Sequence, residues 1–322
     1  MKWGRIALIV GGVLVVAVGG LGVFVATYTP AQRPAPEAFR AATDPGQIER
    51  GQYLAEHVML CGSCHGERYW THFAGPSLSR FNGGECWTHG MDFPGELCAP
   101  NLTPHEHGLA DWTDGEIARA IREGVDKDGR ALAPLMPYTL YRHMSDEDLA
   151  AVVGYLRSLK PVDATYDEPE IDFPVSFFFK LAPAPLDGPV TAPKPAETAE
   201  YGAYLATVGA CIECHTPVDG NHQTIAGKEG WGGQVFHGPF GVVASANITP
   251  SSAGIGGLSK EAFIQRFKDH ETARTPAKVN SNSVMPWTEY AGMSERDLGA
   301  LYAYLRTLPG SEEGVVTFPE AD

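Results

Sequence analysis

The sequence predicts an all-α protein in which two tandem helical domains follow a single N-terminal transmembrane helix. Three observations support this fold: a set of short motifs occurs twice in the same order, each copy closes with a segment of helical periodicity, and the chain begins with a long charge-free stretch. With 322 residues, the chain is long enough for two domains of ordinary size.

The duplication rests on four motifs that recur at nearly constant spacing. In chain order they are Gly-x-Tyr-Leu-Ala (51–55 and 202–206), Asn-x-Thr-Pro (101–104 and 247–250), Met-Pro (136–137 and 285–286) and Tyr-Leu-Arg-x-Leu (155–159 and 304–308). We therefore expect a transmembrane anchor at 1–28, a tether at 29–44, a first domain at 45–160, a Pro-rich connector at 161–197 and a second domain at 198–322.

Each repeat is expected to end in an amphipathic helix. Apolar residues fall on one stripe in both closing segments, and Ser145 with Asp148, like Ser294 with Asp297, has the spacing of a helix-capping pair. The two stripes are Leu149, Val152, Val153, Leu156 and Leu159, and Leu298, Leu301, Tyr302, Leu305 and Leu308.

The connector between the repeats contains eight prolines in residues 160–196, which disfavours a regular helix or a central strand. It also gathers Phe173, Phe177, Phe178 and Phe179 around Pro174. Such aromatic side chains usually pack onto a domain surface, and binding to a partner or to a membrane surface is the alternative.

Residues Ile6 to Thr27 form a 22-residue stretch without a charge, preceded by Lys2 and Arg5. About 20 apolar residues span the hydrocarbon core of a bilayer, whereas a cleaved signal peptide has a shorter apolar region and a small-residue cleavage site. We therefore expect an uncleaved, single-pass anchor. The positive-inside rule then places the domains on the periplasmic side of a bacterial inner membrane.

Two Cys-x-x-Cys-His motifs, at 61–65 and 211–215, predict the chemistry of the chain. The two thiols of such a motif form thioethers with a porphyrin, and the adjoining imidazole ligates its iron. We therefore expect two covalently attached haem c groups, on Cys61, Cys64 and His65 and on Cys211, Cys214 and His215. Zinc is the alternative, but it needs further ligands beside each motif.

The sixth iron ligand decides whether a haem carries electrons or binds a small molecule. Met136 and Met285 are our candidates, because they lie 71 and 70 residues after their motif histidines and 19 residues before the closing Tyr. Met144 and Met293 also correspond, but they lie at the start of the closing helix. The histidines that could compete do not recur at equivalent positions: His57, His72, His89, His105, His107, His143, His222, His237 and His270.

Two further cysteines, Cys86 and Cys98, lie in a stretch that is longer in the first repeat than in the second. In an oxidising compartment a disulfide is the economical explanation. Two free thiols, one or both redox-active, are the alternative.

The formal charge of −15 argues against nucleic acid as a partner, because phosphate backbones bind clustered Lys and Arg. An acidic surface of this kind steers basic redox partners or simply keeps the protein soluble.

Together these motifs resemble the multihaem cytochrome c subunits of membrane-bound alcohol, aldehyde and gluconate dehydrogenases, over about residues 45–160 and 198–309. The resemblance includes Gly254-Ile-Gly256 after the second Asn-x-Thr-Pro. It implies a mostly α-helical class I-like cytochrome c fold in each domain, with His65 and Met136 on one iron and His215 and Met285 on the other. Those subunits usually carry three haems, whereas this chain has two motifs.

We therefore expect a membrane-anchored dihaem cytochrome c that carries electrons and has no catalytic residues of its own. Its partners would be a dehydrogenase, a quinol-oxidising complex or a terminal oxidase. The alternatives are a dihaem peroxidase-type enzyme, which needs an open iron position, and a fixed electron-transfer subunit of a dehydrogenase complex.

Overall fold

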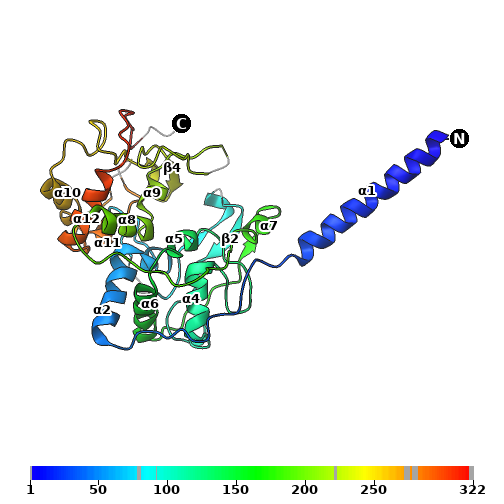
Figure 1. The fold of residues 1–322 in the computed structure, drawn as a ribbon, viewed down its shortest axis with the longest axis horizontal. Helices are drawn as coiled ribbons and strands as arrows, with labels where there is room; N and C mark the ends of the chain where they lie inside the picture. The colour runs from blue at the N-terminus through cyan, green and yellow to red at the C-terminus, as the bar shows by residue number, and fades with distance from the viewer. Residues whose placement is uncertain are drawn as a thin grey trace.

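The structure, a computed structural model, describes residues 2–77, 81–91, 93–220, 223–271, 276–277 and 282–318. Helix α1 (Lys2–Thr27) extends away from a single globular part (Figure 1). Its segment Val10–Thr27 is long and apolar enough to cross a membrane, a property that N-terminal signal sequences share.

The two halves of the globular part contain corresponding helices in the same order. The first half has α2 (Pro45–Tyr53), the π-helix η1 (Leu54–Val58), α3 (Cys61–Cys64), α4 (Asp114–Glu123), α5 (Tyr138–Tyr141) and α6 (Asp146–Ser158). The second half has α8 (Ala199–Val208), α9 (Cys211–Cys214), α10 (Lys260–Lys268), α11 (Trp287–Tyr290) and α12 (Glu295–Leu305).

In each half the first long helix packs against the last one, at a glycine. A Cβ atom on Gly51 would lie 2.0 Å from the carbonyl oxygen of Ala151, and one on Gly202 would lie 1.9 Å from that of Ala300. Only glycine allows the two backbones to approach so closely. The Gly of the Gly-x-Tyr-Leu-Ala motif is therefore a packing residue.

The predicted closing helices are confirmed as α6 and α12. The hydroxyls of Ser145 and Ser294 each accept the backbone N–H three residues later, at 3.1 Å, and so cap the two helices. The predicted apolar stripes face the interior, since Leu149, Leu156 and Leu298 are buried.

The π-helix η1 explains a one-residue difference between the repeats. Cys61 lies ten positions after Gly51, but Cys211 lies only nine positions after Gly202. The N–H of Met59 bonds to the carbonyl of Leu54, five residues back, whereas that of Gly209 bonds to Leu205, four residues back. A π-turn therefore accommodates the extra residue without breaking the helix.

The prediction of an all-α fold is wrong for the extra segments, which contain two small antiparallel sheets. One sheet has the order β1 (Cys86–Trp87), β2 (Gly95–Cys98) and β3 (Glu170–Ile171), and the other pairs β4 (Val235–Gly238) with β5 (Gly241–Ala244). These strands are too short to show alternation in sequence. A 3₁₀ helix, η2 (His89–Met91), lies between β1 and β2.

The predicted disulfide between Cys86 and Cys98 is present, and the two cysteines are opposite each other in the β1–β2 pair. The free-thiol alternative is therefore wrong. The connector supplies only the edge strand β3 and the short helix α7 (Val175–Phe179), as its prolines predict.

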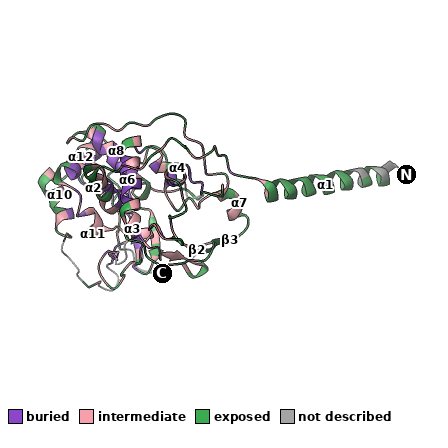
Figure 2. Ribbon diagram, turned by 90° about the horizontal axis from the view of Figure 1, so that it is seen from below, coloured by how far each residue is buried: buried purple, intermediate pink, exposed green. Residues whose placement is uncertain are grey.

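The buried apolar residues of both halves form one contiguous cluster, so the halves share a core. Figure 2 shows buried residues concentrated in α4, α6, α8 and α12. Leu54 and Leu149 of the first half belong to the same cluster as Leu205 and Leu298 of the second.

A reciprocal pair of hydrogen bonds joins the halves at the edge of this core. The hydroxyl of Tyr53 donates to Asp297 at 2.8 Å, and that of Tyr204, its counterpart, donates to Asp148 at 2.6 Å. Each tyrosine oxygen also accepts the backbone N–H of the capping serine in the opposite half, Ser294 or Ser145. The sequence suggested that these aspartates satisfy backbone donors of their own helices, but their carboxylates accept from the tyrosines instead.

Burial and the adjacent carboxylates raise the pKa of Tyr53 and Tyr204 well above the usual value, so both remain hydroxyl donors. Asp297 also accepts from Arg296, and Asp148 from Arg50. Each buried carboxylate is thus paired with an arginine of its own half and with a tyrosine of the opposite half.

We predict that Tyr53→Phe lowers the free energy of unfolding by about 1–3 kcal/mol, because Asp297 loses a donor inside the protein. Urea unfolding of the holoprotein, followed by far-ultraviolet circular dichroism, measures this change. Tyr302→Phe is the control, because its hydroxyl bonds to a backbone carbonyl within the second half. If Tyr53→Phe lowers the free energy of unfolding no more than Tyr302→Phe does, the bond between Tyr53 and Asp297 does not stabilise the interface between the halves.

Candidate haem-attachment sites

Each Cys-x-x-Cys-His motif forms one helical turn that follows a left-handed residue. Leu60 (φ +57°) precedes α3 and Ala210 (φ +54°) precedes α9, although neither is glycine. This conformation is costly for a residue with a side chain and marks a constrained turn. It redirects the chain after the first long helix of each half, so that the motif side chains face a cavity.

The two motif histidines are held in the same way. Nδ1 of His65 lies 2.8 Å from the carbonyl oxygen of Pro100, and Nδ1 of His215 lies 2.7 Å from that of Ala246. A carbonyl only accepts, so Nδ1 carries the hydrogen and the lone pair of Nε2 is available for a metal. Burial lowers the pKa of both imidazoles, which favours the neutral form that ligates.

The Asn-x-Thr-Pro motif positions these carbonyls, a role that the sequence did not reveal. Asn101 and Asn247 directly follow the two carbonyl-bearing residues, and each Asn Oδ1 accepts from the backbone N–H and the hydroxyl of the threonine two residues on, at 2.7–2.9 Å. Each Asn Nδ2 donates to the chain that follows the closing helix, at Val162 or Ser311. The motif thereby ties three segments together beside the histidine.

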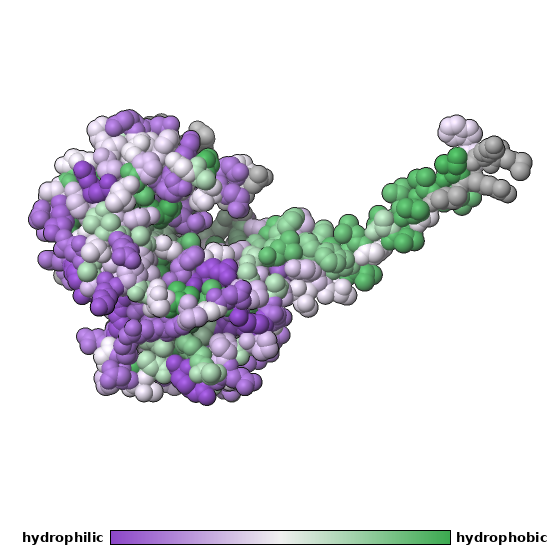
Figure 3. Space-filling model, viewed as in Figure 1, coloured by the Kyte–Doolittle hydropathy of each residue, from purple (hydrophilic) through white to green (hydrophobic). Residues whose placement is uncertain are grey.

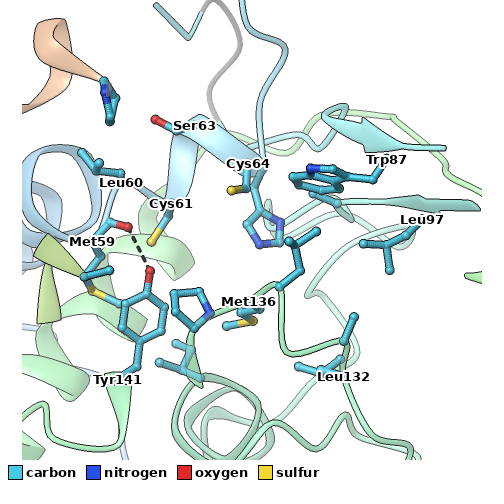
Figure 4. A pocket seen from close by; sticks show the side chains of 18 of the residues that line it. Met59, Leu60, Cys61, Ser63, Cys64, Trp87, Leu97, Leu132, Met136 and Tyr141 are labelled. Atoms are coloured by element: carbon cyan, nitrogen blue, oxygen red, sulfur yellow. Dashed lines mark hydrogen bonds between the residues drawn. The ribbon is translucent and has the colours of Figure 1, made fainter. Parts of the chain in front are cut away.

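The side chains of both sites line one continuous cavity of about 1640 Å³. A pocket for a single small molecule usually measures about 300–1,000 Å³, so this cavity has room for more than one large group. Figure 4 shows Cys61, Cys64 and Met136 directed into the same pocket. The second site contributes its own set to the lining: Cys211, Cys214, His215 and Met285.

The residues fit covalent haem on their donor chemistry. Each half presents two thiols, an imidazole with a free Nε2 and a thioether to the same cavity. Burial raises the pKa of Cys61 and Cys211 to about 12, and that of Cys64 and Cys214 to about 11. Among the described residues, no three His, Cys, Asp or Glu side chains form a metal-binding group, so the further ligands that zinc requires are not assembled there.

The other candidate ligands fall into two groups. Met144 and Met293 are fully buried in the shared core and do not line the cavity. Of the competing histidines, His107 and His270 line it; His270 stacks on Phe73 and makes a tilted contact with Trp287. His222 lies outside the described residues. Those away from the lining are His57, His72, His89, His105, His143 and His237.

Two tyrosines complete the site and were not predicted. The hydroxyl of Tyr141 donates to the carbonyl of Met59 at 2.9 Å (Figure 4), and that of Tyr290 donates to the equivalent carbonyl of Gly209 at 2.8 Å. Both side chains line the cavity, and burial raises their pKa well above the usual value. The available signal was their constant position, five residues after each candidate methionine.

Residues 48–160, which include the first motif, match the family model for cytochrome c.

The chain is also similar over most of its length to several curated proteins. It is 28% identical over 292 residues to the cytochrome c subunit of the alcohol dehydrogenase (quinone) of Gluconobacter oxydans, a match covering 84% of this chain and 56% of that protein. It is 28% identical over 320 residues to a diheme cytochrome c-type protein of Cereibacter sphaeroides, covering 96% of this chain and all of the relative. The cytochrome c subunit of gluconate 2-dehydrogenase from Pantoea cypripedii is 25% identical, over 85% of this chain and 62% of its own length. The chain thus spans little more than half of the dehydrogenase subunits.

Away from the cavity, His89 provides a pH-dependent contact. Its Nε2 lies 2.8 Å from Asp172 and its Nδ1 3.2 Å from Glu96, and these bonds raise its pKa above the usual value. Because the pKa is raised on folding, the contact contributes stability below about pH 6.5, and that contribution is lost as the pH rises through the folded-state value.

We predict that Asp172→Asn lowers the pKa of His89, measured by NMR titration of the imidazole in the reduced holoprotein. Glu170→Gln is the control, because it removes a charge opposite Glu96 in the β2–β3 pair, whereas the two ring nitrogens bond to Glu96 and Asp172. An unchanged His89 titration in Asp172→Asn would rule out this contact in solution.

Proposed function

We propose that this chain is a membrane-anchored dihaem cytochrome c that transfers electrons between a membrane or periplasmic donor and an oxidase or another cytochrome. The observation that carries the proposal is the repetition of a full ligand set: in each half an imidazole, two cysteines and a methionine line the same cavity. The match to the cytochrome c family and the diheme relative support it.

In this proposal, the domains are residues 45–160 and 198–322, and each binds one haem. When bound, a haem supplies reversible cycling between ferric and ferrous iron. Cys61 and Cys64, or Cys211 and Cys214, would attach the porphyrin through thioethers. His65 and His215 would bind iron through Nε2, and the Nδ1 bonds to Pro100 and Ala246 hold the plane of each ring.

Met136 and Met285 would supply the second protein ligand of each iron. A thioether opposite an imidazole closes the iron to small molecules and raises its potential. A chain with two such sites carries electrons and makes no bonds itself, which sets it apart from a peroxidase-type enzyme. The dehydrogenase relatives favour the related proposal that the chain works as an electron-transfer subunit of a larger complex.

Helix α1 is the proposed anchor, with the globular part in the periplasm of a bacterial cell. Its apolar side chains are exposed in the structure, as expected of a segment that lipid surrounds. Lys2 and Arg5 precede the span and favour a cytoplasmic N-terminus.

The intact mass of the purified holoprotein tests the haem content. We predict a mass increase of two haems per chain, and of one haem when Cys211 and Cys214 are both changed to Ala. The Cys86→Ala, Cys98→Ala variant is the control and should keep both haems, because these cysteines form the disulfide. A single haem in the unaltered chain would refute the dihaem proposal.

The methionine ligands predict a visible absorption signature. Met136→Ala and Met285→Ala should each remove about half of the methionine-to-iron charge-transfer band of the oxidised protein and lower the reduction potential of one haem. Met144→Leu is the matched control, because Met144 is buried in the core. A full band in Met136→Ala would show that this methionine is not a ligand.

A further inference from the structure

The connector helix α7 lies beside the carboxyl end of α1, where α1 meets the globular part (Figure 1). The ring of Phe177 contacts those of Phe24 and Tyr28, with centroids 6.2 and 5.7 Å apart. Phe24 and Tyr28 are also in edge-to-face contact with each other. Three aromatic rings thus join the connector to the last turn of α1.

Next to this contact, the connector presents large apolar side chains to the outside. Phe173 is 72% exposed, Phe178 58% and Leu181 48%; we call these three residues the aromatic face. Figure 3 shows apolar surface running from α1 onto the globular part at this place. Large apolar side chains that gather on a protein surface mark a contact with something apolar.

The length of α1 sets the depth of this face. The 18 residues Val10–Thr27 extend about 27 Å along a helix, close to the hydrocarbon thickness of about 30 Å. If the amino end of the span is at one membrane surface, Thr27 is at the other. Tyr28 then lies in the headgroup layer, where aromatic side chains are enriched in membrane proteins. Phe177, which packs against Tyr28, must lie at a similar depth.

We propose that the aromatic face is embedded in the interfacial layer of the bilayer and fixes the orientation of the globular part on the membrane. The proposal rests on the membrane anchor of the proposed function. A bilayer fits better than a partner protein because the face is continuous with the apolar surface of α1.

The acidic residue next to this face does not oppose membrane contact. Asp172 precedes Phe173, but its carboxylate is bonded to His89 at 2.8 Å. Its negative charge is therefore partly satisfied within the protein and is not presented alone to lipid headgroups.

The orientation makes the first haem site the membrane-proximal one. The cavity lining includes Thr27 and Tyr28 from the end of α1 and Ser176 and Phe179 from α7, together with both motifs. Leu97 of β2 lines the pocket together with Cys61 and Cys64 (Figure 4), and β2 pairs with β3, whose chain continues directly into Phe173 and α7. A redox partner within the membrane would therefore exchange electrons with the haem on His65.

The experiment measures lipid contact at one position of the full-length holoprotein. All six native cysteines are used by the thioethers of the proposed haems or by the disulfide, so Phe178→Cys accepts a single nitroxide label. The protein is placed in phospholipid nanodiscs, and the collision rates of the label with oxygen and with a water-soluble nickel chelate are measured by power-saturation electron paramagnetic resonance. The same measurement under nitrogen is subtracted from each value, which removes the relaxation of the label caused by the haem iron.

We expect the label at 178 to collide at least several-fold more with oxygen, relative to the nickel chelate, than a label at Val316→Cys. Val316 is the matched control because it is 71% exposed and lies in the second half. Equal ratios at the two positions, in protein whose intact mass includes α1, would overturn the proposal while leaving the anchor in place.

Loss of α1 from the purified chain, shown by the same mass measurement, would instead refute the anchor. The shorter chain is then mixed with vesicles of phosphatidylcholine and phosphatidylglycerol. A label at 178 that collides mainly with oxygen on these vesicles would support the aromatic face as a membrane contact without the anchor. A label that collides mainly with the nickel chelate would overturn the proposal.

Discussion

The positions of the two sites depend on the exchange of hydrogen bonds between Tyr53 and Asp297 and between Tyr204 and Asp148. In each bond, a tyrosine on the first long helix of one half donates to an aspartate near the start of the other half's closing helix. The same exchange buries two carboxylates, which is tolerable only while both stay paired. The two motifs therefore open into one cavity because the halves are joined at this point and share one core.

Much of the architecture could be predicted because the chain repeats itself. The spacing of Ser145 to Asp148 and the stripe from Leu149 to Leu156 are local signals, and they predicted the cap and the buried side of α6 correctly. The Cys-x-x-Cys-His motifs predicted one site in each half, and the structure adds that the side chains of both motifs line a common cavity. Repetition also distinguished Met136 from Met144, since only position and not residue type separates the two.

The sequence did not show the hydrogen bonds between segments that are far apart in the chain. Asp148 has the spacing of a capping residue, and nothing local indicates that its carboxylate accepts from Tyr204, 56 residues later. Likewise, the sequence did not reveal a role for Asn101 within its repeated motif. Its side chain bonds to Thr103 and to Val162, and Val162 is far away in the chain, beyond α6. The strands of the first half were missed because a two-residue strand has no periodicity, although the Cys86–Cys98 pair was found.

The amide of Asn247 gives the C-terminal segment an unexpected part in the second site. Its Nδ2 donates to the carbonyls of Ser311 and Glu313, while the residue before it holds the ring of His215. The segment that follows α12 therefore helps to hold the His215 imidazole in position. A chain shortened after α12 would keep every proposed iron ligand but would lose the hydrogen bonds that hold Asn247, and with it the carbonyl that fixes the His215 ring.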